Sequence, residues 1–220
     1  DRNPFLPYDE NLYVGDAGPG HLCLLNKFTV VDDHLLVVTR RFEDQESALT
    51  PADFGAVWEL LWEAEGLAFY NSGAVAGASQ PHRHLQLVLG PLCPCGPDIP
   101  IAAACEAAVR AGLPALPELP LAHAFRALPP GRDAAAAASR AARTYADLLA
   151  ALGLRAGSGP PAPYNLLFTR TWMLVVPRSQ ECFQSISVNA LGFAGALLVR
   201  DARELGLLIS HGPVRVLQHV

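Results

Sequence analysis

The chain has little lysine, little methionine and no long hydrophobic run. Lys27 is the only lysine and Met173 the only methionine among 220 residues, and 21 acidic residues outnumber 16 basic ones, for a net charge of −5. This balance offers no broad basic face to a nucleic-acid backbone. No apolar stretch approaches the roughly 20 residues that span a bilayer. We therefore expect a protein that binds neither nucleic acid nor membrane.

Cysteine is also scarce. The five cysteines are an odd number, and they are scattered along a chain that is 51% hydrophobic, which favours a reducing compartment over a disulfide framework. Cys93 and Cys95 are close together but lack a second pair, so we predict inert thiols. The first four residues carry no basic-then-apolar secretion signal. The sequence predicts a cytoplasmic protein with a single domain over residues 1–220.

The order of strand-like and helix-like segments predicts an α+β fold. Thr50-Pro51-Ala52-Asp53 is typical of a helix start, and Trp58 and Trp62 follow at core spacing. Residues 92–163 are rich in Ala and Pro, and we expect a helical insertion whose main helix covers 133–152. Strands are expected over 21–26, 34–39, 67–71, 82–89, 164–169 and 172–176, and helices over 191–200, 202–208 and 214–219. Hairpin-linked strands with helices between them predict an antiparallel sheet flanked by helices.

A row of polar residues lies on one predicted strand. Alternate strand residues share a face, so His82, His84 and Gln86 should line one face. Leucines 85, 87 and 89 should line the opposite, core face. A loop of small residues precedes the row, and its Gly77-Ala78-Ser79-Gln80 segment would let backbone N–H groups approach an anion closely. Asn71-Ser72-Gly73 lies just before this loop.

Two chemistries fit this row. Alternating histidines on a strand can bind zinc, but Gln86 is a poor zinc ligand, and no dedicated metal site is predicted. A nucleophilic imidazole beside a phosphate cradle fits better, because phosphoryl and nucleotidyl transfers need positioning and charge stabilisation around an in-line nucleophile. The pattern favours the second chemistry.

These segments resemble the histidine-triad superfamily, in its transferase branch of diadenosine tetraphosphate phosphorylases (ATP adenylyltransferases). The His-x-His-x-Gln spacing is specific, because Gln86 replaces the third histidine of the hydrolases. The resemblance implies a histidine-triad-like fold, with an adenylyltransferase segment over 164–220. The matching segments are Asn26-Lys27-Phe28, 34–39, 42–45, 48–50, 69–73, 77–86, Tyr164-Asn165-Leu166-Leu167, Trp172-Met173 and Val176-Pro177-Arg178.

The resemblance also implies the roles of individual residues. His84 would attack the α-phosphorus of a dinucleoside polyphosphate, expel ATP and carry AMP covalently, and inorganic phosphate would then release ADP. Gln86 would hold phosphate oxygens, and His82 would order the surroundings of the nucleophile. Substrate contacts are expected from Asn26, Lys27, Asn71, Ser72, Gly77, Ala78, Ser79, Gln80, Tyr164, Asn165, Leu166 and Met173. Arg83, where relatives often have Lys, is expected to face solvent.

Alternative functions remain open at this stage. A sugar-nucleotide uridylyltransferase shares the motif spacing, a histidine-triad hydrolase would release AMP, and a nucleotide sensor would bind without turnover. A divalent cation such as Mg²⁺ is expected to accompany the charged nucleotide, and the protein is expected to be a monomer or a homodimer. The histidines outside the motif, at 21, 34, 123, 211 and 219, are expected to be structural or on the surface.

Overall fold

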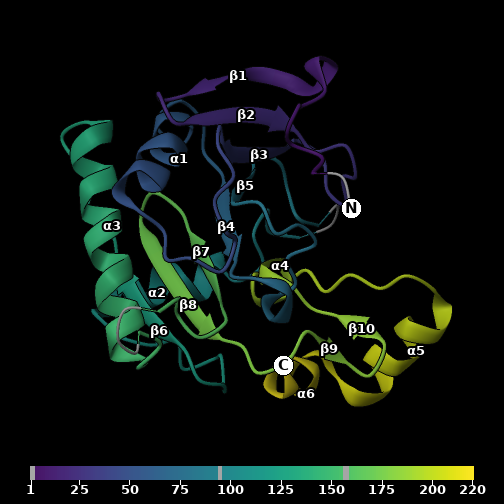
Figure 1. The fold of residues 1–220 in the computed structure, drawn as a ribbon. Coiled ribbons are helices and arrows are strands. Elements are labelled where there is room, and N and C mark those ends of the chain that lie inside the picture. Colours follow the sequence, from purple (N-terminus) through teal and green to yellow (C-terminus); the bar gives the residue numbers. More distant parts are fainter. Residues whose placement is uncertain (1–2, 94–95, 156–158) are drawn as a thin grey trace.

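The computed structural model describes residues 3–93, 96–155 and 159–220. An eight-stranded antiparallel sheet runs in the order β1-β2-β3-β5-β4-β7-β8-β6 (Figure 1). Its strands are β1 (Tyr13–Ala17), β2 (His21–Leu25), β3 (His34–Thr39), β4 (Leu67–Asn71), β5 (His84–Val88), β6 (Ala124–Ala127), β7 (Tyr164–Phe168) and β8 (Trp172–Pro177). Because β4 pairs with β7, the two halves of the chain share one sheet. The predicted α+β class with an antiparallel sheet is confirmed.

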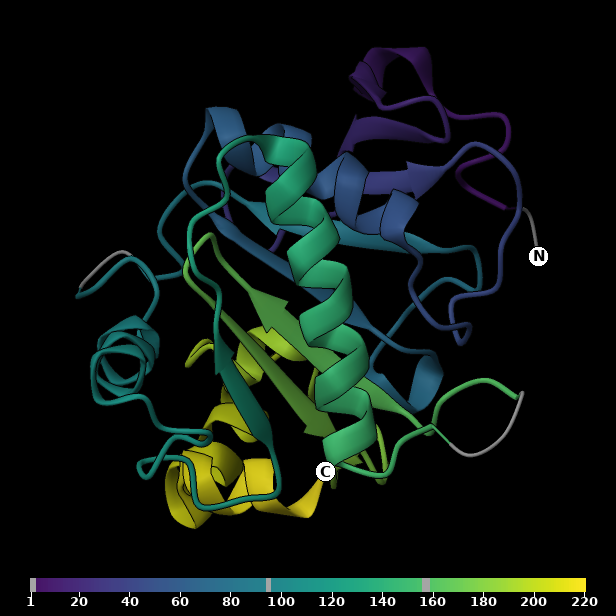
Figure 2. The same ribbon diagram turned by 90° about the vertical axis from the view of Figure 1, so that its left-hand side faces the viewer.

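Helices cover both faces of the sheet. They are α1 (Pro51–Glu63), α2 (Ala102–Ala111), α3 (Ala134–Ala151), α4 (Ala190–Phe193), α5 (Ala202–His211) and α6 (Pro213–His219), and a separate hairpin joins β9 (Cys182–Phe183) to β10 (Ile186–Ser187). Helix α1 begins as predicted, with a capping box between Thr50 and Asp53. Helix α3 crosses one face of the sheet (Figure 2), and α1 packs on the same core. None of the helices within the described ranges is long and apolar enough to cross a membrane.

Three of the sequence-based predictions about the fold are wrong here. The insertion is not purely helical, because β6 forms within it and pairs with β8. The predicted helix over 191–200 ends at Phe193 in α4. Gly195 adopts a left-handed φ of 102°, which α-helical backbone cannot continue. Trp62 is also not a core residue, since it is 46% exposed whereas Trp58 is 3% exposed.

The alternation along β5 separates the core from a second, polar face. Leu85 and Leu87 are fully buried in the core that α1 and α3 cover. His84 and Gln86 therefore project from the opposite face of the sheet. Leu89 lies beyond the end of the strand and is 37% exposed, so its predicted core placement is wrong.

Candidate active site

A cavity of about 730 Å³ lies on this polar face. It is walled by the segment before β1, the turn after β2, the loop after β4 and the start of α4. The predicted site residues that line it are Asn26, Lys27, Asn71, Gly77, Ser79, Gln80, His84 and Gln86. The remaining predicted residues lie outside its lining: Ser72, Ala78, His82, Tyr164, Asn165, Leu166 and Met173.

His84 is held as a neutral imidazole with a defined tautomer. Its Nδ1 lies 2.8 Å from the backbone oxygen of His82, and a carbonyl can only accept, so Nδ1 carries the proton. The Nε2 lone pair is thereby left to the cavity. Burial lowers the pKa of His84 to about 4, because desolvation penalises the charged ring. The ring is therefore neutral at pH 7, and its unprotonated Nε2 is nucleophilic.

The backbone of His84 is clamped by Gln45. The Gln45 carboxamide accepts from the His84 N–H at 2.8 Å and donates to the His84 carbonyl at 3.2 Å. It also donates to the Asn71 carbonyl at 2.9 Å, which ties β5 to β4. Gln45 is 1% exposed. The nucleophile therefore sits on a fixed stretch of backbone.

The prediction that His82 shares a strand face with His84 is wrong, because β5 begins only at His84. The His82 Nε2–H points away from the cavity, toward the carbonyls of Thr39 at 2.9 Å and Arg41 at 3.1 Å. Nδ1 accepts from the Asn3 amide at 3.0 Å. These bonds hold the His82 ring, and the backbone carbonyl of the same residue sets the tautomer of His84. The ordering role expected of His82 stays a prediction.

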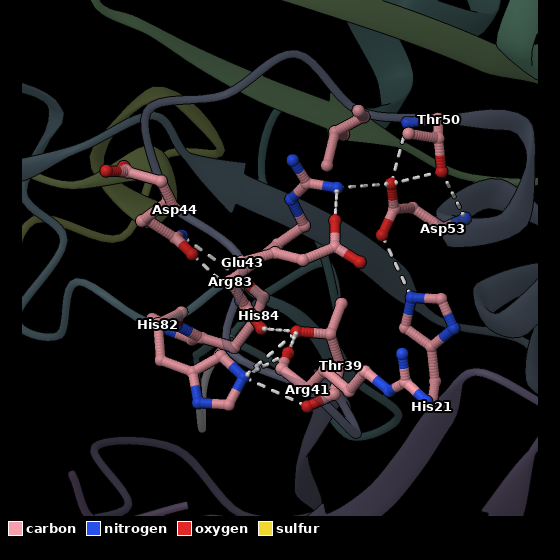
Figure 3. Close-up of polar contacts among 12 residues, drawn as sticks. His21, Thr39, Arg41, Glu43, Asp44, Thr50, Asp53, His82, Arg83 and His84 are labelled. Carbon is pink, nitrogen blue, oxygen red and sulfur yellow. Dashed lines mark hydrogen bonds and ion pairs between the residues drawn. The ribbon is translucent and has the colours of Figure 1, made fainter.

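The prediction that Arg83 faces solvent is wrong, because its side chain is buried, with 3% exposed. Figure 3 shows its side chain pointing between two carboxylates. Its Nη1 donates to Glu43, and to Asp53 at 3.2 Å. Burial raises the pKa of Asp53, but hydrogen bonds from His21 and Thr50 and the Arg83 charge outweigh it, so the pKa is lowered overall. A buried ion pair therefore anchors the motif to the start of α1.

His34 is a site residue that sequence reasoning missed. It is 3% exposed, lines the cavity, and contacts Gln86 Oε1 through Nε2 at 2.9 Å. Its Nδ1 lies 3.1 Å from the Asn26 amide nitrogen. No local pattern in the sequence indicates this contact, because it depends on the register between β3 and β5. Leu36 pairs with Gln86, which places His34 two residues along the same face.

Asn71 presents its NH₂ group to the cavity, because its Oδ1 already accepts two hydrogen bonds from elsewhere. Oδ1 accepts from Asn165 Nδ2 at 2.8 Å and from the Ala190 N–H at 3.0 Å. Asn165 is in turn held by the buried Arg178 guanidinium at 2.6 Å. Asn165 therefore holds the Asn71 side chain and does not line the cavity itself. Tyr164, Leu166 and Met173 are fully buried in the core.

The wall before β1 and the cradle loop complete the cavity. Phe5, 7% exposed, places its ring 5.3 Å from the His84 ring, a contact that no sequence motif indicated. Gly77 has a φ of 87°, and a Cβ there would lie 2.8 Å from the Val188 carbonyl. Only glycine fits this close backbone approach. Exposed Lys27 adds a positive charge at the wall.

This cavity places a neutral buried imidazole beside the amides of Gln86 and Asn71, a glycine-bearing loop and a lysine, which is the type of site that a nucleotidyltransferase needs. Comparisons agree with this class. The Ap4A phosphorylase N-terminal domain family matches residues 1–107, and the ATP adenylyltransferase C-terminal domain family matches residues 117–220. The chain belongs to the Ap4A phosphorylase (ATP adenylyltransferase) family, and the resemblance drawn from the motifs is confirmed.

Individual relatives cover nearly the whole chain. "Diadenosine 5',5'''-P1,P4-tetraphosphate phosphorylase 2" of Saccharomyces cerevisiae is 33% identical over an alignment of 234 positions that covers 93% of this chain and 70% of that protein. "Protein APA1" of the same organism is 28% identical over an alignment of 219 positions that covers 86% of this chain and 64% of that protein. The crystal structure of yeast Ap4A phosphorylase Apa2 in complex with AMP has a TM-score of 0.79 at 30% identity, over 98% of this chain and 78% of Apa2. The Apa2 complex with Ap4A has a TM-score of 0.78 at 29% identity, over 99% of this chain and 79% of Apa2.

Proposed function

We propose that the protein is an ATP adenylyltransferase that cleaves diadenosine tetraphosphate (Ap4A) with inorganic phosphate into ATP and ADP. The observation that carries the proposal is the unprotonated Nε2 of His84, left to the cavity by the bond from Nδ1–H to the His82 carbonyl. The names of the relatives, Ap4A phosphorylase and ATP adenylyltransferase, support the same reaction.

In the first step, His84 Nε2 forms a bond to the α-phosphorus of one adenylate. The bond from that phosphorus to the bridging oxygen breaks, and ATP leaves with the electron pair. The imidazole becomes cationic as AMP is attached, and the His82 carbonyl, 2.8 Å from Nδ1, stabilises that charge. The amides of Gln86 and Asn71 donate to the phosphate oxygens that gain charge.

In the second step, an oxygen of inorganic phosphate attacks the same phosphorus. The bond to Nε2 breaks, ADP forms, and the ring regains its lone pair. The two steps together convert Ap4A and phosphate into ATP and ADP, and the reverse sequence uses the same groups. Lys27 would attract the polyphosphate, and the loop that contains Gly77, Ser79 and Gln80 would hold it.

A divalent cation such as Mg²⁺ would arrive with the nucleotide. Across the described residues, no group of three or more His, Cys, Asp or Glu side chains could hold a metal ion. Asp9 is the one carboxylate on the described cavity wall, so oxygen ligands for Mg²⁺ would come mainly from phosphates and water. The expectations of a cytoplasmic location, of a monomer or homodimer, and of no nucleic-acid partner stay predictions, testable by cell fractionation, sedimentation and gel-shift assays.

The test is to incubate purified protein with Ap4A, with and without phosphate. ATP and ADP should appear in equal amounts only with phosphate, and His84→Ala should abolish turnover while the exposed His219→Ala should not. Quenching in alkali with labelled Ap4A should trap AMP on His84. Release of AMP with water would indicate a hydrolase, and binding without turnover a sensor. Preferential use of uridine diphosphate sugars would indicate a uridylyltransferase.

A further inference from the structure

We propose that His34 is a positioning residue that fixes the orientation of the Gln86 amide, with Asn26 as the outer link of the same relay. The inference rests on the proposed function for its kinetic consequence. His34 begins β3, and its ring bridges the two amides: Nε2 lies 2.9 Å from Gln86 Oε1 and Nδ1 lies 3.1 Å from Asn26 Nδ2.

The relay has one consistent set of donors and acceptors. The Asn26 oxygen already accepts from the Phe28 N–H at 3.1 Å, so its NH₂ group must face His34. His34 Nδ1 therefore accepts, which places the ring proton on Nε2 and makes Gln86 Oε1 the acceptor. If the Gln86 amide were flipped, its NH₂ group would face the His34 Nε2–H, and two donors would meet without an acceptor. Its NH₂ group is thus committed to the cavity that Gln86 lines.

This commitment matters because a free glutamine amide has two nearly equivalent orientations. In one of them its oxygen, rather than its N–H groups, would face the phosphate oxygens and repel their charge. A preset donor needs no reorganisation when negative charge grows in the transition state. Burial lowers the pKa of His34, although its bond to Gln86 opposes the shift, so the ring is neutral at pH 7 and both links hold.

His34 also lines the cavity, so a direct substrate contact must be separated from action through Gln86. A double-mutant cycle does this. Values of kcat and KM for Ap4A phosphorolysis would be measured for wild type, His34→Ala, Gln86→Ala and the double variant. We expect His34→Ala to lower kcat about tenfold with little change in KM, and to cost almost nothing further once Gln86 is alanine.

A conservative variant provides the rescue. Glutamine carries an N–H donor near the position of histidine Nε2, so His34→Gln should recover most of the kcat that His34→Ala loses. The matched control is His21→Ala, which removes another buried strand histidine, bonded to Asp53 at 2.9 Å and absent from the cavity lining. Its effect should simply add to that of Gln86→Ala. Additive losses for His34→Ala, or no recovery in a folded His34→Gln, would overturn the proposal.

A spectroscopic readout is independent of turnover. Nitrogen-15 NMR of the wild-type protein should show His34 as the Nε2–H tautomer, and Asn26→Ala should weaken that preference. A His34 ring protonated on Nδ1 would refute the relay even in an active enzyme. An inactive wild-type protein with the Nε2–H tautomer would instead refute the proposed function and leave the relay standing.

Discussion

Arg83 offers a direct test of how the motif is anchored. Arg83→Met keeps the length of an apolar stem but removes the charge that lies 3.2 Å from Asp53. Asp53 is 1% exposed, and among the described residues it would keep only His21 and Thr50 as partners. Removing one member of a buried pair costs about 3–5 kcal/mol. That is a large share of the roughly 5–15 kcal/mol that holds a domain folded.

Lysine at the same position should behave differently. Only Nη1 of Arg83 contacts both carboxylates, and the buried Nε has no hydrogen-bond partner among the described residues. The lysine side chain is one bond shorter, so its ammonium keeps the charge and a hydrogen bond to one of the two carboxylates, and it leaves no buried Nε behind. We expect Arg83→Lys to cost about 1 kcal/mol, the worth of one hydrogen bond.

Urea unfolding at pH 7, followed by tryptophan fluorescence, measures both variants. The control is Arg110→Met, which removes an exposed pair with Glu106 at 3.8 Å and should cost under about 0.5 kcal/mol. The folded-state pKa of Asp53 is lowered, so its stabilising effect is present above the unfolded pKa and is lost as pH falls through the folded one. The gap between Arg83→Met and wild type should shrink in acid. A loss below about 1 kcal/mol at pH 7 would refute a buried ion pair here.

Three further predictions follow from the geometry. With the pKa of His84 lowered to about 4, single-turnover release of ATP without phosphate should hold its rate from pH 8 down to about 5, and an acid limb near the ordinary histidine pKa of about 6.5 would contradict this. Gly77→Ala should reduce activity and cost about 1–3 kcal/mol in thermal unfolding, whereas Gly112→Ala, also at positive φ but with open space around its Cβ, should leave turnover unchanged. Tyr145→Phe should cost about 1–3 kcal/mol in urea unfolding because it orphans the buried Leu49 N–H, now 3.1 Å from the hydroxyl; a neutral effect would contradict that bond.

Local sequence patterns predicted much of the fold and part of the candidate site correctly. The predicted cap at Thr50 correctly marked the start of α1, because a cap acts within three residues of itself. The Ala-rich stretch predicted as a helix over 133–152 forms α3. Strand periodicity placed Leu85 and Leu87 in the core. It failed for His82, because the pairing of β3 with β5 starts only at His84, and pairing depends on a partner strand that periodicity does not contain.

The amino-acid sequence by itself determined the antiparallel class, the main helices and the motif with its Gln86, since each follows from neighbours a few residues apart. Only the tertiary structure decided which groups work together. It buried Arg83 against Asp53, set Asn165 behind Asn71, and brought His34 from β3 to Gln86 on β5. These contacts join residues separated by 30, 94 and 52 positions, and their hydrogen bonds exist only where sheet register and side-chain direction coincide.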